Sequence, residues 1–474
     1  MGKYKYLAKN IGLLTLSNFA TNLLNFFLVP LYTNVLSTSD YGTYDLISTT
    51  IGVLLPILTL NIQEAVMRYA MDRNYDRKAV LTIGVRYVAL GSIIVIAGLA
   101  VNAFFNFNKL INEYWIFFFL MFFVQSLSGL TTFYIRGVDK VYELSISSAI
   151  ASFVTISLNI IFLVLLKWGL IGYFLANLIG PFVQVIFLIV RGKLIKDLNL
   201  KEKYKAETKE MLSYSRPLIA NSIAWWVNNA ADRYVVIFFC GLAANGVYSV
   251  ASKIPSILNV FQVIFNQAWS LSAVKDFDPD DKSGFFANTY AAYNCFLTVV
   301  CSAIIVMDKP LARFLYAKDF FVAWRFVPWL TIAVLFGALS GYLGGFFTAA
   351  KDSKMFAIST VAGAITNIVL NLLITPVLGP LGAAIATTVC YFEVYVIRFV
   401  QSKKYISFKI KLVRDILTYL LLVLQAIVIL LVDNTGKLYG ILVTIFIVIC
   451  ILHVKDIYNI TKKFAVRARD RIMN

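Results

Sequence analysis

Long apolar stretches separated by short polar loops fill nearly the whole chain. We read fourteen of them, near 11–36, 43–67, 79–105, 113–135, 142–166, 168–190, 212–239, 246–271, 285–307, 323–348, 355–377, 380–401, 412–432 and 438–454. Most are long enough to cross a bilayer, because a helix of about 20 apolar residues spans the hydrocarbon layer. The pattern predicts an all-α integral membrane protein with about 14 transmembrane helices.

The first twelve stretches form two halves that share residues at nearly constant spacing. The matched pairs are Gly42 and Gly246, Tyr44 and Tyr248, and Gln63 and Gln267 at an offset of 204, Asn159 and Asn371 at 212, and Asp139 and Asp352 at 213. Six spans per half is an even number, so both halves enter the membrane from the same face. The sequence therefore predicts two bundles related by a parallel repeat, the plan of a carrier with a site between its halves.

This organisation predicts five segments along the chain. They are a six-helix bundle over 1–190, a basic cytoplasmic linker over 191–211, a second six-helix bundle over 212–405, two additional transmembrane helices over 406–457 and a basic cytoplasmic tail over 458–474.

Basic residues outnumber acidic ones by 43 to 25, and they gather on one side of the predicted membrane. That side holds the lysines near the N-terminus, the linker, the six basic residues from Arg398 to Arg414 and the tail. The opposite side holds seven: Lys109, Lys167, Lys309, Arg313, Lys318, Arg325 and Lys437. This bias indicates that both termini are cytoplasmic in a multi-pass protein of the cell membrane, and it explains the positive charge without nucleic acid.

Polar side chains recur on the seventh and eighth stretches. Asn221, Trp225, Asn228 and Asp232 are spaced by four, three and four residues, which places them on one helical face. Lys253 and Asn266 follow on the eighth stretch, with Gln267 beside them. Two such faces can line a wet cavity or pack against each other. We favour the cavity, because helix packing in lipid prefers small residues.

Charges lie deep in these two stretches. Asp232, Arg233 and Lys253 are each about 15 Å along a helix from the turn near Leu242, and therefore near the bilayer midplane. Charged residues at that depth are functional candidates. Asp232 and Lys253 could instead form a packing ion pair, in which case Arg233 would still lack a partner. The surplus positive charge indicates an anionic cargo, and arginine suits phosphate oxygens.

The first half offers a softer set of candidates. Asn22 on the first stretch and Gln63 on the second are polar positions that could face the same cavity. Glu64 and Arg68 are four residues apart, which predicts a helical ion pair that either gates the cavity or lies at the membrane surface. In the second half, Pro255 is the best candidate for a hinge, because it lies two residues from Lys253.

The sequence contains no Gly-x-x-x-x-Gly-Lys phosphate loop, no cysteines at metal-binding spacing and one histidine. The run Asp278-Pro279-Asp280-Asp281 resembles a metal-dependent transferase motif, but it lies in a short loop, and we read it as a turn. We therefore expect no enzyme activity, no metal and no cofactor, apart from a coupling ion such as H⁺ or Na⁺.

Two segments resemble the polysaccharide-transporter, or Wzx-type, oligosaccharide flippases of the MATE-like superfamily. They are LSTSDYGTYDLIS at 36–48 and the stretch 228–274, which contains Asp-Arg-Tyr and Asn-Gln-Ala-Trp. The resemblance implies a pair of bundles that rock between inward and outward states. Carried over by position, Asp232, Arg233 and Lys253 match charged cavity positions of the family, and Asn266 and Gln267 match its polar motif.

The resemblance and the charges together predict a flippase. Its cargo would be an oligosaccharide linked through pyrophosphate to a polyprenyl lipid, moved to the outer leaflet by alternating access for cell-surface polysaccharide assembly. Arg233 and Lys253 would hold the pyrophosphate, and Asp232 would tune or release them. A multidrug or cation antiporter of the same fold is an alternative, although it would favour a negative cavity, and a polysaccharide polymerase or ligase is another. We expect a monomer that contacts membrane lipids and other polysaccharide-assembly proteins.

Overall fold

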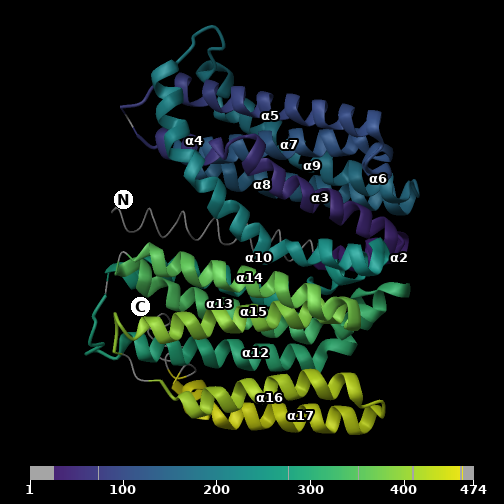
Figure 1. Cartoon of the computed structure of the whole chain (residues 1–474), viewed down its shortest axis with the longest axis vertical. Helices are drawn as coiled ribbons and strands as arrows, with labels where there is room; N and C mark the ends of the chain where they lie inside the picture. The colour runs from purple at the N-terminus through teal and green to yellow at the C-terminus, as the bar shows by residue number, and fades with distance from the viewer. Residues whose placement is uncertain are drawn as a thin grey trace, which may run out of the picture. The chain divides into compact units, whose positions relative to one another are not determined.

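The computed structural model describes residues 26–72, 74–275, 277–350, 352–407, 410–459 and 462, and within them every regular element is helical. The chain forms two compact units that divide between Tyr234 and Val235 (Figure 1). Each unit is a bundle of long apolar helices, which confirms the predicted all-α membrane fold.

The first unit is built from helices that run back and forth along one another (Figure 1). They are α2 (Val29–Val35), α3 (Thr38–Leu58), α4 (Ile62–Ala70), α5 (Arg77–Phe105), α6 (Lys109–Glu113), α7 (Trp115–Gly137), α8 (Val141–Asn159), the π-helical η1 (Ile160–Leu165), α9 (Gly169–Gly192), the 3₁₀ turn η2 (Leu194–Asp197) and the first part of α10 (Lys205–Ala251). Apolar side chains of α4, α5, α7 and α9 form its largest core.

The second unit continues from α10. It contains α11 (Ser256–Lys275), α12 (Phe285–Leu315), the 3₁₀ segment η3 (Lys318–Arg325), α13 (Val327–Ala349), α14 (Ser353–Leu378), α15 (Pro380–Ser402), α16 (Leu412–Leu431) and α17 (Thr435–Leu452). Helix α13 is its centre, because most of that helix is buried.

The described residues contain 11 helices long and apolar enough to cross a membrane, and 12 when the bent pair α3 and α4 counts as one span. The eighth predicted stretch is broken in two, since α10 ends at Ala251 and α11 begins at Ser256. Most of the first predicted stretch lies outside the described residues. A total of about 14 crossings is consistent with these helices.

Three breaks interrupt the helices, and two of them lie where the sequence predicts a turn or a hinge. Helices α3 and α4 meet at 61°, where Leu60 and Asn61 take left-handed backbone angles. Gly241 (φ 85°, ψ 174°) interrupts α10 at the turn predicted near Leu242, and only glycine adopts such angles readily. Pro255 ends the turn before α11, so the predicted hinge residue does lie at a break in a helix.

The predicted linker, 191–211, is packed against the first unit. The carboxylate of Asp197 accepts a hydrogen bond from Tyr134, and Leu194 and Met211 are buried in the core of that unit. The compact unit extends further, to Tyr234, because side chains of α10 bond to α3 and α4. The domain boundaries predicted from the sequence repeat stay a prediction.

The two additional helices are integrated into the second unit through buried polar contacts. Gln425 of α16 accepts a hydrogen bond from Ser302 of α12 at 2.8 Å and donates to the carbonyl of Leu442 on α17 at 3.1 Å. The hydroxyl of Tyr419 on α16 donates a hydrogen bond to Oδ1 of Asn294 on α12 at 3.0 Å. Polar bonds of this kind fix helix positions where apolar contacts alone give little specificity.

Candidate functional site

Arg233 on α10 lies against α3 in the first unit. Its Nη1 atom is 3.2 Å from Oδ1 of Asp45 and donates a hydrogen bond to Oγ1 of Thr49 at 2.9 Å. Asp45 and Thr49 are four residues apart, so they lie on one face of α3, one turn from each other. The Arg233 side chain is 25% exposed and the Asp45 side chain 10%. The result is a partly exposed guanidinium held by a more buried carboxylate.

This geometry corrects one part of the sequence interpretation, which expected Arg233 to lack a partner. The sequence does show Asp45 as a charged residue inside the second apolar stretch. It does not identify Asp45 as the partner of Arg233. Thr49 is also the first-half counterpart of Lys253 at the repeat offset of 204. Asp232 itself is buried, and its Oδ1 accepts a hydrogen bond from the backbone N–H of Arg233 at 3.0 Å.

Aromatic side chains stand beside the ion pair. The indole of Trp226 donates to the carbonyl of Thr49 at 3.0 Å, and the ring centroids of Trp226 and Tyr234 are 5.5 Å apart. The hydroxyls of Tyr234 and Thr50 share a hydrogen bond at 2.6 Å. Gly52 leaves room for the indole, since a Cβ there would lie 3.8 Å from it. A cation is thus flanked by flat rings with polar tips, a surface suited to a phosphorylated sugar.

One face of α10 makes these contacts. Ser222, Trp226 and Arg233 are spaced by four and seven residues, and Ser222 accepts a hydrogen bond from Asn61 at 3.2 Å. The predicted polar face, which runs through Asp232, is one residue out of phase and so points about 100° away. The face that the sequence pattern missed is the one that anchors α10 to α3 and α4.

Lys253 and Pro255 lie in the second unit, in the turn between α10 and α11. Lys253 is partly exposed, and its backbone carbonyl accepts a hydrogen bond from Ser256 at 2.6 Å. Among the described residues Lys253 forms no ion pair. It therefore remains a candidate cation, in a different unit from Arg233.

One residue of the Asn-Gln-Ala-Trp segment on α11, Trp269, has a structural role. Trp269 is 4% exposed, donates to the carbonyl of Tyr342 at 2.8 Å and stacks on that ring at 4.1 Å. Asn266 packs over Gly341, whose added Cβ would lie 3.2 Å from its Nδ2 atom. In the described part of the chain no donor reaches Asn266 Oδ1. Trp269 is a core anchor, so it is not available to contact sugar.

The predicted ion pair between Glu64 and Arg68 does not form within the described residues, so that prediction is wrong. The basic side chain that acts on Glu64 is Arg136, because the last turn of α7 packs against α4. Helical spacing allows the pair, but a neighbouring helix offers a competing charge. Gln63 also faces α7, where a Cβ on Gly129 would lie 2.4 Å from its Oε1 atom. These residues support the packing of α4 and show no gate.

Three predicted site residues cannot be placed. Asn22 lies outside the described residues, and the side chains of Asn228 and Gln267 are likewise outside the description.

A second polar cluster lies on α14 and α15, and the sequence singled out only one of its members. Asn371 donates from Nδ2 to the carbonyl of Asn367 at 2.9 Å, and Asn367 donates to Thr387 at 3.3 Å. Asn159, the repeat counterpart of Asn371, likewise donates to the carbonyl four residues before it, at 2.8 Å. The two halves of the repeat thus share this hydrogen bond from the side chain to the backbone as well as the asparagine itself.

The acidic run 278–281 is a capping turn. Asp281 accepts hydrogen bonds from the N–H groups of Phe286 and Ala287, at 3.0 and 2.8 Å, at the start of α12. Over the described ranges no cluster of His, Cys, Asp and Glu could hold a metal.

Helices of this length and order define a multi-pass, all-α membrane fold of the MATE-like class. The fold resembles the lipid II flippase MurJ in an inward closed conformation, with a TM-score of 0.69 at 17% identity over 94% of this chain and 98% of that one. It also resembles an inward-facing multidrug resistance MATE family transporter of the MOP superfamily, with a TM-score of 0.65 at 15% identity over 81% and 94% of the two chains. For a MOP superfamily transporter from Pyrococcus furiosus the TM-score is 0.56, at 14% identity over 84% and 94%.

The sequence itself identifies the family. Residues 7–270 match the family described as polysaccharide biosynthesis protein, and the chain belongs to that family. A comparison with curated protein sequences gave no match. The match confirms the resemblance drawn from 36–48 and 228–274, and the protein is a multi-pass membrane protein of the polysaccharide biosynthesis family.

Proposed function

We propose that the protein is a flippase that moves polyprenyl-pyrophosphate-linked oligosaccharide repeat units from the cytoplasmic to the outer leaflet. The observation that carries this proposal is the partly exposed guanidinium of Arg233 beside Trp226 and Tyr234. Arginine presents a planar set of donors that matches two phosphate oxygens at once. The family match supports a polysaccharide intermediate as cargo.

Asp45 gives the site a way to release its cargo. In the structure Arg233 pairs with Asp45 at 3.2 Å. A pyrophosphate would take over part of that pairing, and the return of Asp45 would favour release after the bundles rock. The exchange is feasible because the guanidinium keeps an exposed part and can form two parallel hydrogen bonds to phosphate oxygens. Lys253 would be a second cation for the same head group.

The rest of the cargo would meet chemistry that suits it. Sugars would contact polar and aromatic side chains such as Tyr234, while the prenyl chain stays among the lipids. We place both termini on the cytoplasmic side of the cell membrane, as the basic residues favour. A gradient of H⁺ or Na⁺, or consumption of the product outside, would drive net movement.

The test is reconstitution of the full chain in liposomes with a labelled polyprenyl-pyrophosphate oligosaccharide, following its arrival in the opposite leaflet. Arg233→Ala should flip about tenfold more slowly, since it removes a charge-assisted hydrogen bond. Arg233→Lys should lie between, because it keeps the charge and loses the planar fork. Arg191→Ala, at the exposed end of α9, is the matched control and should flip at the wild-type rate.

Equal rates for wild type and Arg233→Ala, with equal melting temperatures, would overturn the role of Arg233. If wild type moves no lipid but expels cationic dyes, the protein is an antiporter of the same fold.

A further inference from the structure

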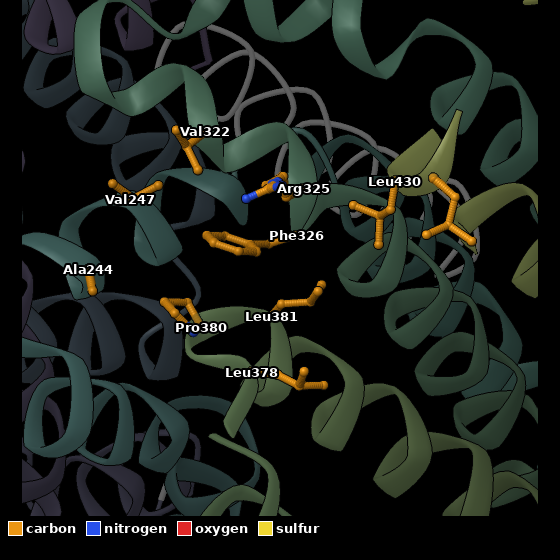
Figure 2. Close-up of a pocket in the computed structure, with 10 residues that line it drawn as sticks. Ala244, Val247, Val322, Arg325, Phe326, Leu378, Pro380, Leu381 and Leu430 are labelled. Carbon is orange, nitrogen blue, oxygen red and sulfur yellow. The ribbon is translucent and has the colours of Figure 1, made fainter. Parts of the chain in front are cut away.

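A cavity of about 540 Å³ lies in the second unit, and neither Arg233 nor Lys253 is among the residues that line it. Segment η3, the turn between α14 and α15 and the end of α16 surround it, and Figure 2 shows Arg325 and Phe326 facing Pro380 and Leu381 across the space. Arg325 is the one charged residue among the ten that line it. The volume falls in the range of about 300–1,000 Å³ found for small-molecule sites.

The apolar wall of the cavity continues onto the helix surface. Leu378 is 47% exposed, Val322 44% and Leu431 74%, and all three line the cavity. These residues lie at or beside the ends of membrane-spanning helices. Apolar side chains so exposed at such a place are suited to contact a hydrocarbon chain rather than water.

Positive charge gathers at the same place. Lys309 and Arg325 lie on the ring of Trp324, at 4.3 Å and 5.9 Å from its centroid. In the part of the chain that the structure describes, neither cation forms an ion pair with a carboxylate. Arg313 and Lys318 are close in sequence, so four of the seven basic residues predicted on the less basic side fall within 309–325. The exposed acidic residues near these helix ends are Asp319 and Asp433.

We propose that this cavity binds one anionic phospholipid of the surrounding bilayer, with an acyl chain against Phe326 and Leu381 and the phosphate on Arg325 and Lys309. Charge complementarity selects this occupant, because basic pockets between transmembrane helices bind anionic head groups. A bound lipid would join η3 to the end of α16. It would thereby stabilise the attachment of the two additional helices, whatever cargo the protein carries.

The experiment is native mass spectrometry and thermal unfolding of the full-length protein in detergent, with phosphatidylglycerol, phosphatidylethanolamine or inorganic phosphate added. Wild type should retain phosphatidylglycerol about tenfold better than phosphatidylethanolamine and melt at a higher temperature with it. Arg325→Gln should lose this preference. Lys109→Gln is the matched control, since it removes an equal charge from an exposed side chain of the first unit and should keep the preference.

Ala244→Phe, which fills the cavity from the α10 wall without changing charge, should also reduce retention. Equal retention of the two phospholipids by wild type, or full retention by Arg325→Gln, would overturn the proposal. An equal effect of inorganic phosphate, or displacement of bound phosphatidylglycerol by added polyprenyl pyrophosphate, would also overturn it. In those cases the cavity would be a simple anion site or a part of the transport route.

Discussion

Two arginines on membrane-spanning helices are held in opposite ways. In the first unit Arg233 pairs with a carboxylate and is one quarter exposed. In the second unit Arg398 of α15 is 6% exposed, and it donates hydrogen bonds to neutral partners: Ser359 Oγ at 3.0 Å, the carbonyl of Ser340 at 2.9 Å and Thr360 Oγ1 at 3.0 Å. Its guanidinium also lies 4.1 Å from the ring centroid of Phe356.

The difference separates a charge that can change partners from one that cannot. The partners of Arg398 come from α13 and α14, so the guanidinium fastens three helices together. Removal of the guanidinium would leave the two hydroxyls and the carbonyl without these hydrogen bonds in a buried region, where water cannot replace them. Arg233 keeps an exposed part, so a phosphate can reach it. We infer that Arg398 acts on folding and Arg233 on transport.

The largest expected effect is that of Arg398→Met. Three hydrogen bonds to neutral partners disappear, at roughly 1 kcal/mol each, so the variant should lose about 3 kcal/mol of stability. Its melting temperature in detergent should fall by several degrees, which scanning fluorimetry would measure. Arg398→Lys should restore little, because an ammonium group cannot reproduce three divergent bonds from a planar fork.

Lys403→Met is the control, since it removes a positive charge near the end of the same helix, where the side chain is exposed. Its free energy of unfolding should lie within about 0.5 kcal/mol of the wild-type value. A stable Arg398→Met protein that fails to transport would contradict the comparison, because Arg398 would then be a functional cation.

Asp45→Asn should have a smaller effect of a different kind. The variant removes the carboxylate that competes with phosphate for Arg233. The affinity for a polyprenyl pyrophosphate should rise about fivefold, as expected for the loss of a competing pair worth about 1 kcal/mol. Flipping should become slower, because release is now harder. Equilibrium binding and the liposome assay would measure the two quantities separately.

The matched control is Asp280→Asn, which breaks an exposed pair with Lys282 at 3.6 Å and should change neither quantity. Weaker binding by Asp45→Asn would show that Asp45 orients Arg233 for its ligand and does not compete with it.

The sequence predicted the helical class, the turn at Gly241 and the break at Pro255, because apolar runs and backbone breakers are local signals. It also placed Arg233 deep in a span by counting residues from the turn. It could not identify Asp45 as the partner, since 188 residues separate the two and only folding brings α3 against α10.

Arg398 shows a second limit of sequence reasoning. Its position near the end of a predicted span, among other basic residues, led to its assignment to the cytoplasmic side. The structure buries it, because hydroxyls from α14 and a carbonyl from α13 meet it there. The pair Glu64 and Arg68 failed for the related reason that spacing along one helix says nothing of charges on the next.

The smallest expected effect concerns the repeat-related turns at Asp139 and Asp352. Asp139 has a left-handed backbone (φ 63°), whereas Asp352 caps α14 by accepting from the N–H of Met355 at 3.1 Å. The Tyr405 hydroxyl also donates to the Asp352 carboxylate, and these bonds hold the pKa of Asp352 below its ordinary value. A lowered pKa stabilises the fold above the ordinary carboxyl value, and the gain is lost as the pH falls through the folded value.

Tyr405→Phe should therefore lower the melting temperature slightly at pH 7, and its curve should converge with that of wild type as the pH falls through the lowered pKa of Asp352. Tyr142→Phe, an exposed tyrosine on α8 in the first unit, is the control and should follow wild type throughout. A difference that stays constant with pH would mean that Tyr405 acts through its ring, which lies 5.6 Å from that of Phe347, and not through Asp352. In that case the two turns would differ in packing alone, and the carboxylate of Asp352 would contribute no more to the second unit than Asp139 does to the first.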